Sequence, residues 1–378
     1  MRKLIRRVLI LLILEIQLLT LAGCWDSQDI EEMSIPIVGG YDLVDPVKDK
    51  DVITDGLVVT GVFPNLSPET DNKVRVEPII GLTTGMTRYT RDLGSPEIFV
   101  PGMLQVGIFG EDLAKKDVNK IIDNLFRTAK IKNTLYLAVA EGRADELLKM
   151  PVKDYQNIGI YLLGLLRHAQ QRSYMPSVTL HEFGVNSILP GRNPILPIIK
   201  TEGSEITFTG IGVFRKSELI TKLDLKDARS LFLLRREKGQ GRIPFIVIKN
   251  EKQVDTGTVE VTNSGKVRVE PVGDDFIFDI KIKLTGTLIE HENEESLQKQ
   301  PERLQDIEQT VAADIEQDCR DFIKKMQEEL KVDCIDINKY ALAKWRNELE
   351  DQIDNDFIEK VKINVEVEVH LKNTGELT

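Results

Sequence analysis

The stretch TLYLAVA at residues 134–140 carries almost no polar side chain. A short, continuous apolar run of this kind predicts a strand buried on both faces, as in a parallel sheet. A strand-like run, VPGMLQVGIF, precedes it at residues 100–109. The segment between them opens with Glu111-Asp112-Leu113, which places acids at the positive end of a helix, and continues with helical spacing through residues 118–126. Strand, helix and buried strand in this order predict a β-α-β crossover in the first half of the chain.

The second half predicts a different arrangement. The closing segment VKINVEVEVHL, residues 361–371, alternates apolar and polar side chains, as FIFDIKIKL does at residues 276–284. Both patterns are typical of half-buried strands. A long amphipathic helix lies between residues 290 and 330, and its apolar positions recur every three or four residues: Ile307, Val311, Ile315, Cys319, Phe322, Met326 and Leu330. We expect this helix to pack on its own sheet rather than to form a coiled coil with a partner.

These patterns predict a multi-domain α+β (mixed α/β) protein. The N-terminal domain would contain the β-α-β unit, and the C-terminal domain a largely antiparallel sheet packed by the long helix. A cluster of prolines and a glycine at residues 190–197 resembles a linker. We therefore divide the chain into residues 1–23, 24–200 and 201–378, with two subdomains allowed in the middle part. The strand at 206–214 would open the last domain, and Asn263-Ser264-Gly265 predicts a hairpin turn.

The N-terminus has the layout of a lipoprotein signal peptide. Four basic residues lie within residues 1–7, an apolar run extends from Val8 to Leu21, and Leu21-Ala22-Gly23-Cys24 follows. The run of roughly 14 residues is shorter than the ~20 that cross a bilayer, although Glu15 within it is unusual. We expect cleavage before Cys24 and attachment of diacylglyceryl and N-acyl lipid to its thiol. Two or three acyl chains hold a protein firmly on a membrane, on the extracytoplasmic side in this case.

The net negative charge of the chain argues against certain classes of partner. Without residues 1–23 the chain has 46 basic and 60 acidic residues, a net charge of −14. This balance argues against nucleic acid as a partner and against adhesion to an anionic membrane through a basic face. The lipid would have to supply the anchoring.

The remaining cysteines, Cys319 and Cys334, allow either a disulfide, as in many exported proteins, or two buried free thiols. We favour free thiols, because Cys319 falls on the apolar stripe of the long helix.

The sequence contains no strong catalytic signal. The four histidines, at positions 168, 181, 291 and 370, have no metal-ligand spacing, and no P-loop, G-x-S-x-G or G-x-G-x-x-G motif occurs in the required context. We therefore expect neither an enzyme nor a protein that binds a metal or cofactor. The chemistry that the sequence indicates is acylation of Cys24.

Several segments resemble the Ger(x)C family of spore germination lipoproteins, the C subunits of germinant receptors. The resemblance rests on segments spread in order along nearly the whole chain: Gly23-Cys24-Trp25-Asp26 with Ile30-Glu31, Glu111 to Ala114, Glu141 to Leu148, Pro176 to Leu180, Gly210 to Arg215, and Asn373-Thr374-Gly375. One departure lies at Cys334-Ile335-Asp336-Ile337, where the family tends to have a glycine-rich turn.

The resemblance implies a non-enzymatic receptor subunit that acts in nutrient-triggered germination. It would sit on the outer face of the spore inner membrane and assemble with two multi-span subunits. Whether this subunit binds a small-molecule germinant stays open. Trp25, Asp26 and Ile30 are candidate docking residues because they follow Cys24 closely. The alternative function is an extracytoplasmic solute-binding lipoprotein of a transporter.

Overall fold

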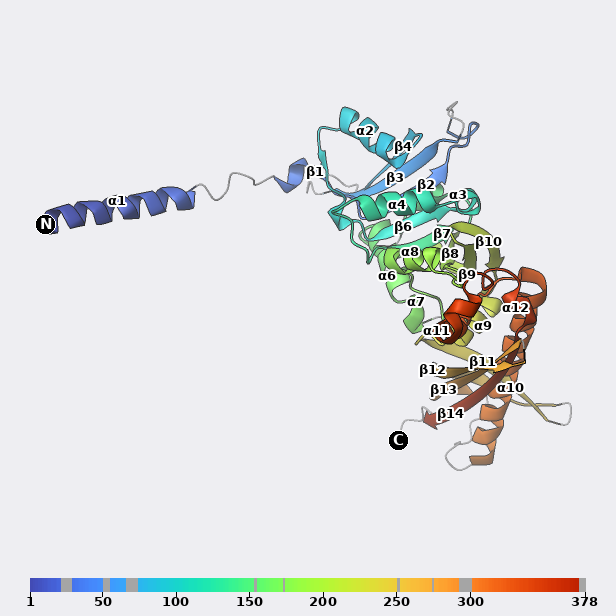
Figure 1. The fold of residues 1–378 in the computed structure, drawn as a ribbon. Helices are drawn as coiled ribbons and strands as arrows, with labels where there is room; N and C mark the ends of the chain where they lie inside the picture. Colours follow the sequence, from blue (N-terminus) through green and yellow to red (C-terminus); the bar gives the residue numbers. More distant parts are fainter. Residues whose placement is uncertain are drawn as a thin grey trace.

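The computed structural model of the chain describes residues 1–21, 29–49, 55–65, 74–152, 155–172, 174–249, 252–273, 275–291 and 301–373. Two large sheets with helices around them make up most of this part (Figure 1). The predicted mixed α+β class is confirmed. No helix in the described ranges combines the length and apolar character that a membrane span needs.

The first sheet has eight strands, and its centre is parallel. Its strands follow in space as β10 (Glu218–Leu223), β9 (Glu205–Arg215), β8 (Ile195–Glu202), β7 (Tyr136–Ala140), β6 (Val106–Gly110), β2 (Val38–Leu43), β3 (Leu57–Pro64) and β4 (Val74–Gly81). Strands β2, β6, β7 and β8 pair in parallel, and the outer strands are antiparallel. The helices α3 (Glu111–Lys116) and α4 (Asn119–Arg127) connect β6 to β7, so the predicted β-α-β crossover is confirmed.

Helices cover both faces of this sheet (Figure 1). One hydrophobic core joins α3, α4 and α8 (Leu180–Ile188) to the sheet, and the core on the opposite face includes α5 (Ala144–Leu148) and α6 (Ile158–Arg167). The short helix α7 (Ala169–Arg172) follows α6. The helix α1 (Arg2–Leu21) precedes the folded body in the chain (Figure 1).

A small annex lies beside the β3–β4 end of the sheet (Figure 1). It contains η1 (Ile30–Glu32), β1 (Met33–Ser34), α2 (Thr84–Gly94), β5 (Ile98–Phe99) and η2 (Pro101–Met103). Strand β1 pairs in parallel with β5, so the chain enters the folded body here.

The second large sheet has the order β11 (Gln240–Lys249), β12 (Lys252–Val272), β13 (Asp275–His291) and β14 (Lys362–Asn373). All its pairs are antiparallel except β13–β14. The remaining helical segments of this half are α9 (Leu225–Arg235), α10 (Pro301–Lys325), η4 (Met326–Leu330), α11 (Asn338–Leu349) and α12 (Phe357–Lys360).

The long helix packs on its own sheet, as predicted. The stripe residues from Ile307 to Met326 are at most 1% exposed and share one core with β11–β14, and Leu330 is half-buried against it. In addition, two α10 carboxylates accept hydrogen bonds from the backbone of the edge strand β14. The N–H of Val367 donates to Glu316 over 3.1 Å and that of Leu371 donates to Glu308 over 2.6 Å.

The predicted hairpin at Asn263-Ser264-Gly265 is wrong, because β12 runs straight through it for 21 residues. These turn-forming residues serve other purposes. The Asn263 side chain bonds to Glu237 O (2.6 Å) and Gly239 N (2.9 Å) in the loop after α9. A Cβ at Gly265 would lie 2.6 Å from Lys281 O, so glycine permits the close approach of β13.

The strand expected at 206–214 exists as part of β9, which pairs within the eight-stranded sheet. Hydrogen bonding in this sheet continues through Leu223, well beyond the proline cluster. The domain boundary at residue 200 stays a prediction. Proline spacing cannot reveal that β8, which begins within the cluster, and the two strands after it, β9 and β10, all pair in the first sheet.

Cys319 and Cys334 are both free and fully buried, which confirms the interpretation as buried thiols. Burial raises the pKa of each thiol to about 12. A thiol in such surroundings stays protonated at neutral pH and reacts slowly.

We therefore predict that Cys319→Ala and Cys334→Ala each lower the free energy of unfolding by about 1 kcal/mol, because each leaves a small cavity. The melting temperature of the wild-type protein should be the same with and without reductant. A large drop in the melting temperature with reductant would reveal a disulfide and contradict the assignment.

Candidate functional site

The predicted anchor and docking residues lie where the chain enters the fold. Cys24, Trp25 and Asp26 are outside the described residues, so their placement is not tested. Ile30 begins η1 and its side chain is 63% exposed, as a docking residue would need to be. Three residues later Met33 pairs with Ile98 of β5.

The structure brings two of the family-like segments together at the carboxyl ends of the parallel strands. The segment beginning at Glu111 follows β6, and the segment 141–148 follows β7. The Glu111 N–H donates to Gly142 O over 2.8 Å, and Gly142 adopts φ +90°, a conformation that favours glycine. Sequence analysis found each segment separately, and the parallel register places them side by side.

A buried carboxylate joins a third strand to this edge. Asp42, near the end of β2, is 3% exposed and accepts hydrogen bonds from Ala144 N (2.8 Å) and Asp145 N (2.9 Å) at the start of α5. A Cβ at Gly110 would lie 2.0 Å from Asp42 Oδ1, so a glycine at the end of β6 leaves room for the carboxylate.

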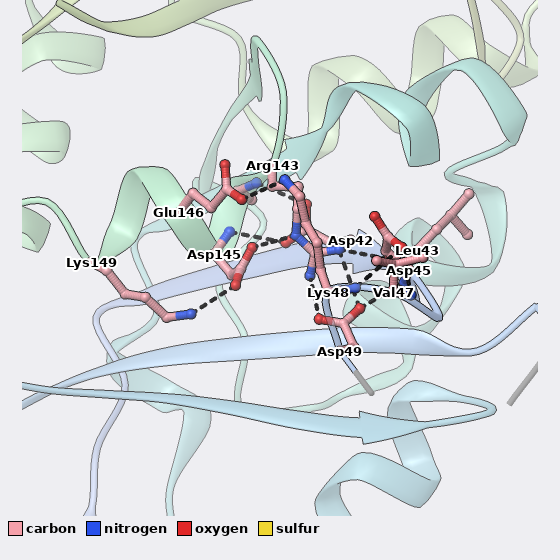
Figure 2. Close-up of polar contacts among 11 residues, drawn as sticks. Asp42, Leu43, Asp45, Val47, Lys48, Asp49, Arg143, Asp145, Glu146 and Lys149 are labelled. Carbon is pink, nitrogen blue, oxygen red and sulfur yellow. Dashed lines mark hydrogen bonds and ion pairs between the residues drawn. The ribbon is translucent and has the colours of Figure 1, made fainter. Parts of the chain in front are cut away.

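Arg143 extends the network to the loop after β2 (Figure 2). Its guanidinium donates to Asp145 (2.7 Å), to both carboxylate oxygens of Asp49 (3.0 and 3.2 Å) and to Leu43 O (3.3 Å). The side chains of Arg143 and Asp49 are only 13% and 12% exposed. A largely buried fork of this kind fixes the loop on the sheet.

The loop also holds itself in place (Figure 2). The Asp45 carboxylate accepts from Val47 N at 2.9 Å, and Asp45 N donates to Asp49 over 2.7 Å. At the rim, Lys48 pairs with Glu146, and Lys149 pairs with Asp145, over 2.7 and 2.8 Å respectively.

Sequence analysis missed Asp42, Asp49 and Arg143 as members of one network. The available signal was weak, since an acid at the end of an apolar strand can also face solvent. Their partners come from segments about 100 residues away along the chain.

The pKa values of two carboxyl groups at this edge, Asp42 and Glu111, are shifted in opposite directions. Burial raises the pKa of Asp42 to about 6, although the two amide donors and Arg143 oppose that shift. Partial burial also acts to raise the pKa of Glu111, but its ion pairs with Lys115 and Lys222, both at 2.8 Å, outweigh that effect and lower the pKa to about 2. Lys222 lies on β10, so this pair links α3 to the far edge of the sheet.

The carboxylates at this edge are all held by donors. The carboxylates of Asp42, Asp49, Glu111 and Asp145 are each engaged by amide or cationic donors. Among the described residues no group of His, Cys, Asp and Glu is arranged to hold a metal. His168, His181 and His370 lie on separate elements.

A cavity of about 250 Å³ lies between residues of the first sheet's half and the second half. Basic side chains from both halves line it, including Arg192, Arg215 and Lys331. Such a location is where a two-lobed solute binder would hold its ligand.

Direct hydrogen bonds fasten the two halves beside this cavity. Arg235 donates to Cys334 O (2.7 Å) and to Asn193 O (2.9 Å), with its side chain 6% exposed. Gly191 N donates to Asp354 over 2.7 Å. Near the same junction Asp336 adopts φ +58°, so an aspartate has the left-handed conformation that suits glycine in the family's turn.

Comparison with known proteins gives a consistent result. Residues 26–201 match the family model described as spore germination protein N-terminal domain, and residues 209–375 match spore germination B3/GerAC like, C-terminal. Spore germination protein B3 of Bacillus subtilis (strain 168) is 22% identical over 330 residues, which cover 84% of each chain. Spore germination protein GerQC of Bacillus cereus is 28% identical over 144 residues, 38% of this chain and 40% of that relative.

The solved crystal structure of the GerBC protein has a similar fold. The TM-score is 0.56 at 18% sequence identity, and the match covers 90% of this chain and 99% of that one.

We predict that Asp42→Ala lowers the free energy of unfolding by about 3 kcal/mol, because two buried backbone amides, those of Ala144 and Asp145, lose their acceptor. Glu146→Ala is the matched control. It breaks only the exposed pair with Lys48 and should cost ~0.5 kcal/mol or less. Denaturant unfolding measures both, and equal small effects would show that the network does not hold this edge.

Proposed function

This chain belongs to the GerAC-like family of spore germination proteins, and we propose that it is the lipid-anchored, non-enzymatic subunit of a germinant receptor. Its role in spore germination follows from family models that match residues 26–201 and 209–375. The finer function is the proposal. It rests chiefly on one observation, the sequence Leu21-Ala22-Gly23-Cys24 directly ahead of a family-matched, folded body.

The anchor proposal places the body outside the cytoplasm. The basic start and apolar helix α1 would direct export, and cleavage before Cys24 would remove that helix. The first core residue of the folded body, Val38, follows Cys24 by 14 positions, so the proposed cleavage site lies ahead of the described cores. Diacylglyceryl and N-acyl chains on Cys24 would then hold the protein on the extracytoplasmic face of the spore inner membrane.

The proposed partners are two multi-span receptor subunits, as the family resemblance implies. Trp25, Asp26 and Ile30 are the proposed docking residues, since they lie within a few residues of Cys24. The exposed side chain of Ile30 supports this assignment. The rigid polar edge around Asp42 would offer such partners a fixed surface rather than a reactive centre.

The alternative, a solute-binding lipoprotein, would need two lobes that close around a ligand. The cavity of about 250 Å³ between the halves is the observation in its favour. The hydrogen bonds of Arg235 and Gly191 across the same junction speak against a hinge, because closing or opening would break buried bonds.

We predict that Cys24→Ala yields a precursor that is neither lipidated nor cleaved, and that germination is impaired. In detergent phase separation of spore extracts the wild-type protein should enter the detergent phase as a mature, acylated form. Mass spectrometry of residue 24 reports the acylation directly. An unmodified Cys24 in the wild-type protein would refute the anchor.

We further predict that Trp25→Ala keeps lipidation and folding but lowers co-capture of two multi-span proteins from detergent-solubilised spores. Truncating a large aromatic side chain that is buried at an interface costs ~2 kcal/mol or more of binding free energy. Ile248→Ala is the control, because Ile248 is an equally apolar, 66% exposed residue in β11 of the distant sheet. Unchanged capture of the multi-span proteins in both variants would show that Trp25 does not contribute to the interface.

Calorimetry separates this proposal from the solute binder. The fragment from Ser27 onward should show no saturable heat with amino acids, sugars or nucleosides at millimolar concentration. Saturable heat that is lost in Arg192→Ala, a residue lining the cavity between the halves, would favour the alternative.

A further inference from the structure

Helix α2 buries polar side chains and exposes apolar ones. Thr84, Thr87 and Arg91 are buried at 9%, 3% and 7% exposure. Tyr89 and Leu93, by contrast, are 65% and 71% exposed. A surface helix of a globular protein normally shows the opposite arrangement, with the apolar stripe toward the core.

The buried side of α2 is fixed in this orientation. The Arg91 guanidinium lies between the rings of Phe63 and Phe99, 4.9 and 4.8 Å from their centroids. Arg88 donates hydrogen bonds to Asn124 (3.2 Å) and Thr128 (3.0 Å) at the end of α4. These contacts hold the helix from two sides, so the apolar face cannot rotate inward without exposing the aromatic pocket.

The exposed side forms one narrow stripe. Met86, Tyr89 and Leu93 follow the spacing 3, 4, which at ~100° per residue places them within an arc of about 60°. Leu82, two residues before the start of the helix, is a further exposed apolar residue. Each is between 47% and 71% exposed. Ile98, four residues beyond the helix end, is another exposed apolar side chain at 47%. Thr90 and Asp92 flank the stripe on either side.

The stripe lies at the end of the molecule where the chain enters. Figure 1 shows α2 and β1 at the end opposite the four-stranded sheet. Ile98 itself pairs with Met33 of β1. Nine residues separate Cys24 from Met33, and a chain of that length spans at most ~32 Å. A lipid on Cys24 would therefore keep this end of the body close to the bilayer.

We propose that the apolar stripe of α2, together with Ile98, inserts into the membrane interface when Cys24 is acylated. The inference rests on the lipid anchor proposed above. The tether favours lipid over a second copy or a protein partner, because it brings this end to the bilayer without any further component. Tyr89 suits the interface, since its ring is apolar and its hydroxyl reaches water. The chain has no basic excess for headgroups, so an apolar contact is what it can offer.

The consequence is orientation. A single acylated residue holds the body at one point and leaves its tilt against the bilayer undetermined. A second contact at α2, which hydrogen bonds attach to α4, would set the tilt of the eight-stranded sheet against the membrane and present its polar edge at a constant height.

The test uses the acylated full chain on phosphatidylcholine–phosphatidylglycerol vesicles. Tyr89→Cys carries an environment-sensitive fluorophore. Labelling is selective, because Cys319 and Cys334 are fully buried and acylation occupies Cys24. Nitroxide lipids with a quencher at shallow acyl depth should reduce the emission to about half, since interfacial helices lie ~5–10 Å deep. The same label at Ile248→Cys, a residue of matched exposure on β11, should keep its emission.

A second variant checks the stripe itself. Leu93→Asp in the labelled chain should abolish quenching at residue 89 while leaving the melting curve unchanged, because Leu93 is exposed. Vesicle flotation separates the two proposals: a chain that floats without quenching at residue 89 refutes the stripe but keeps the anchor. A chain that does not float with the vesicles refutes the anchor. In that case quenching of the label at residue 89 is measured on a chain that a His tag at residue 24 attaches to nickel lipid. Absence of quenching on nickel lipid refutes the stripe. The stripe is also refuted if the label at residue 89 changes its emission only when the multi-span proteins are captured with the chain.

Discussion

A single buried carboxylate, Asp42, organises the polar edge of the parallel sheet. It ends β2, occupies the space that Gly110 leaves at the end of β6, and accepts the first amides of the helix after β7. Three neighbouring strands are thereby fixed at one point. Arg143 then depends on that point, because the start of α5 sets its position over the loop that contains Asp49. Removing the carboxylate would leave buried donors without partners, which costs more than the loss of an exposed ion pair.

Much of the fold could be predicted from local patterns. Local apolar patterns match the observed burial in three places: the alternation in residues 361–371, the stripe from Ile307 to Met326 and the crossover around residues 134–140. Local signals failed where long-range contacts decide. Asn263 and Gly265 are residue types that favour turns, yet both lie inside a strand. Asn263 bonds to the loop near residue 237, and Gly265 leaves room for the backbone of Lys281. The Asp42 network could not be predicted because its members are distant along the chain.

The junction between the halves gives the molecule mechanical continuity. Arg235 reaches from α9 to backbone carbonyls on both sides, so the annex with α2 and the distant four-stranded sheet belong to one connected body. A contact made at the α2 end, such as the proposed one with lipid, would then change the orientation of the other end rather than the internal shape of the body. This property suits a subunit that positions partners better than one that closes around a solute.

Edge strand β14 has a further consequence for a protein that the proposed lipid anchor would confine to a surface. Tethering raises the local concentration of copies, and an open strand edge would invite one copy to extend the sheet of the next. On β14 two outward amides, those of Val367 and Leu371, are already taken by Glu316 and Glu308 of α10. An incoming strand would have to displace both carboxylates before it could pair. The helix that completes the core therefore also opposes strand addition at these two positions of the edge.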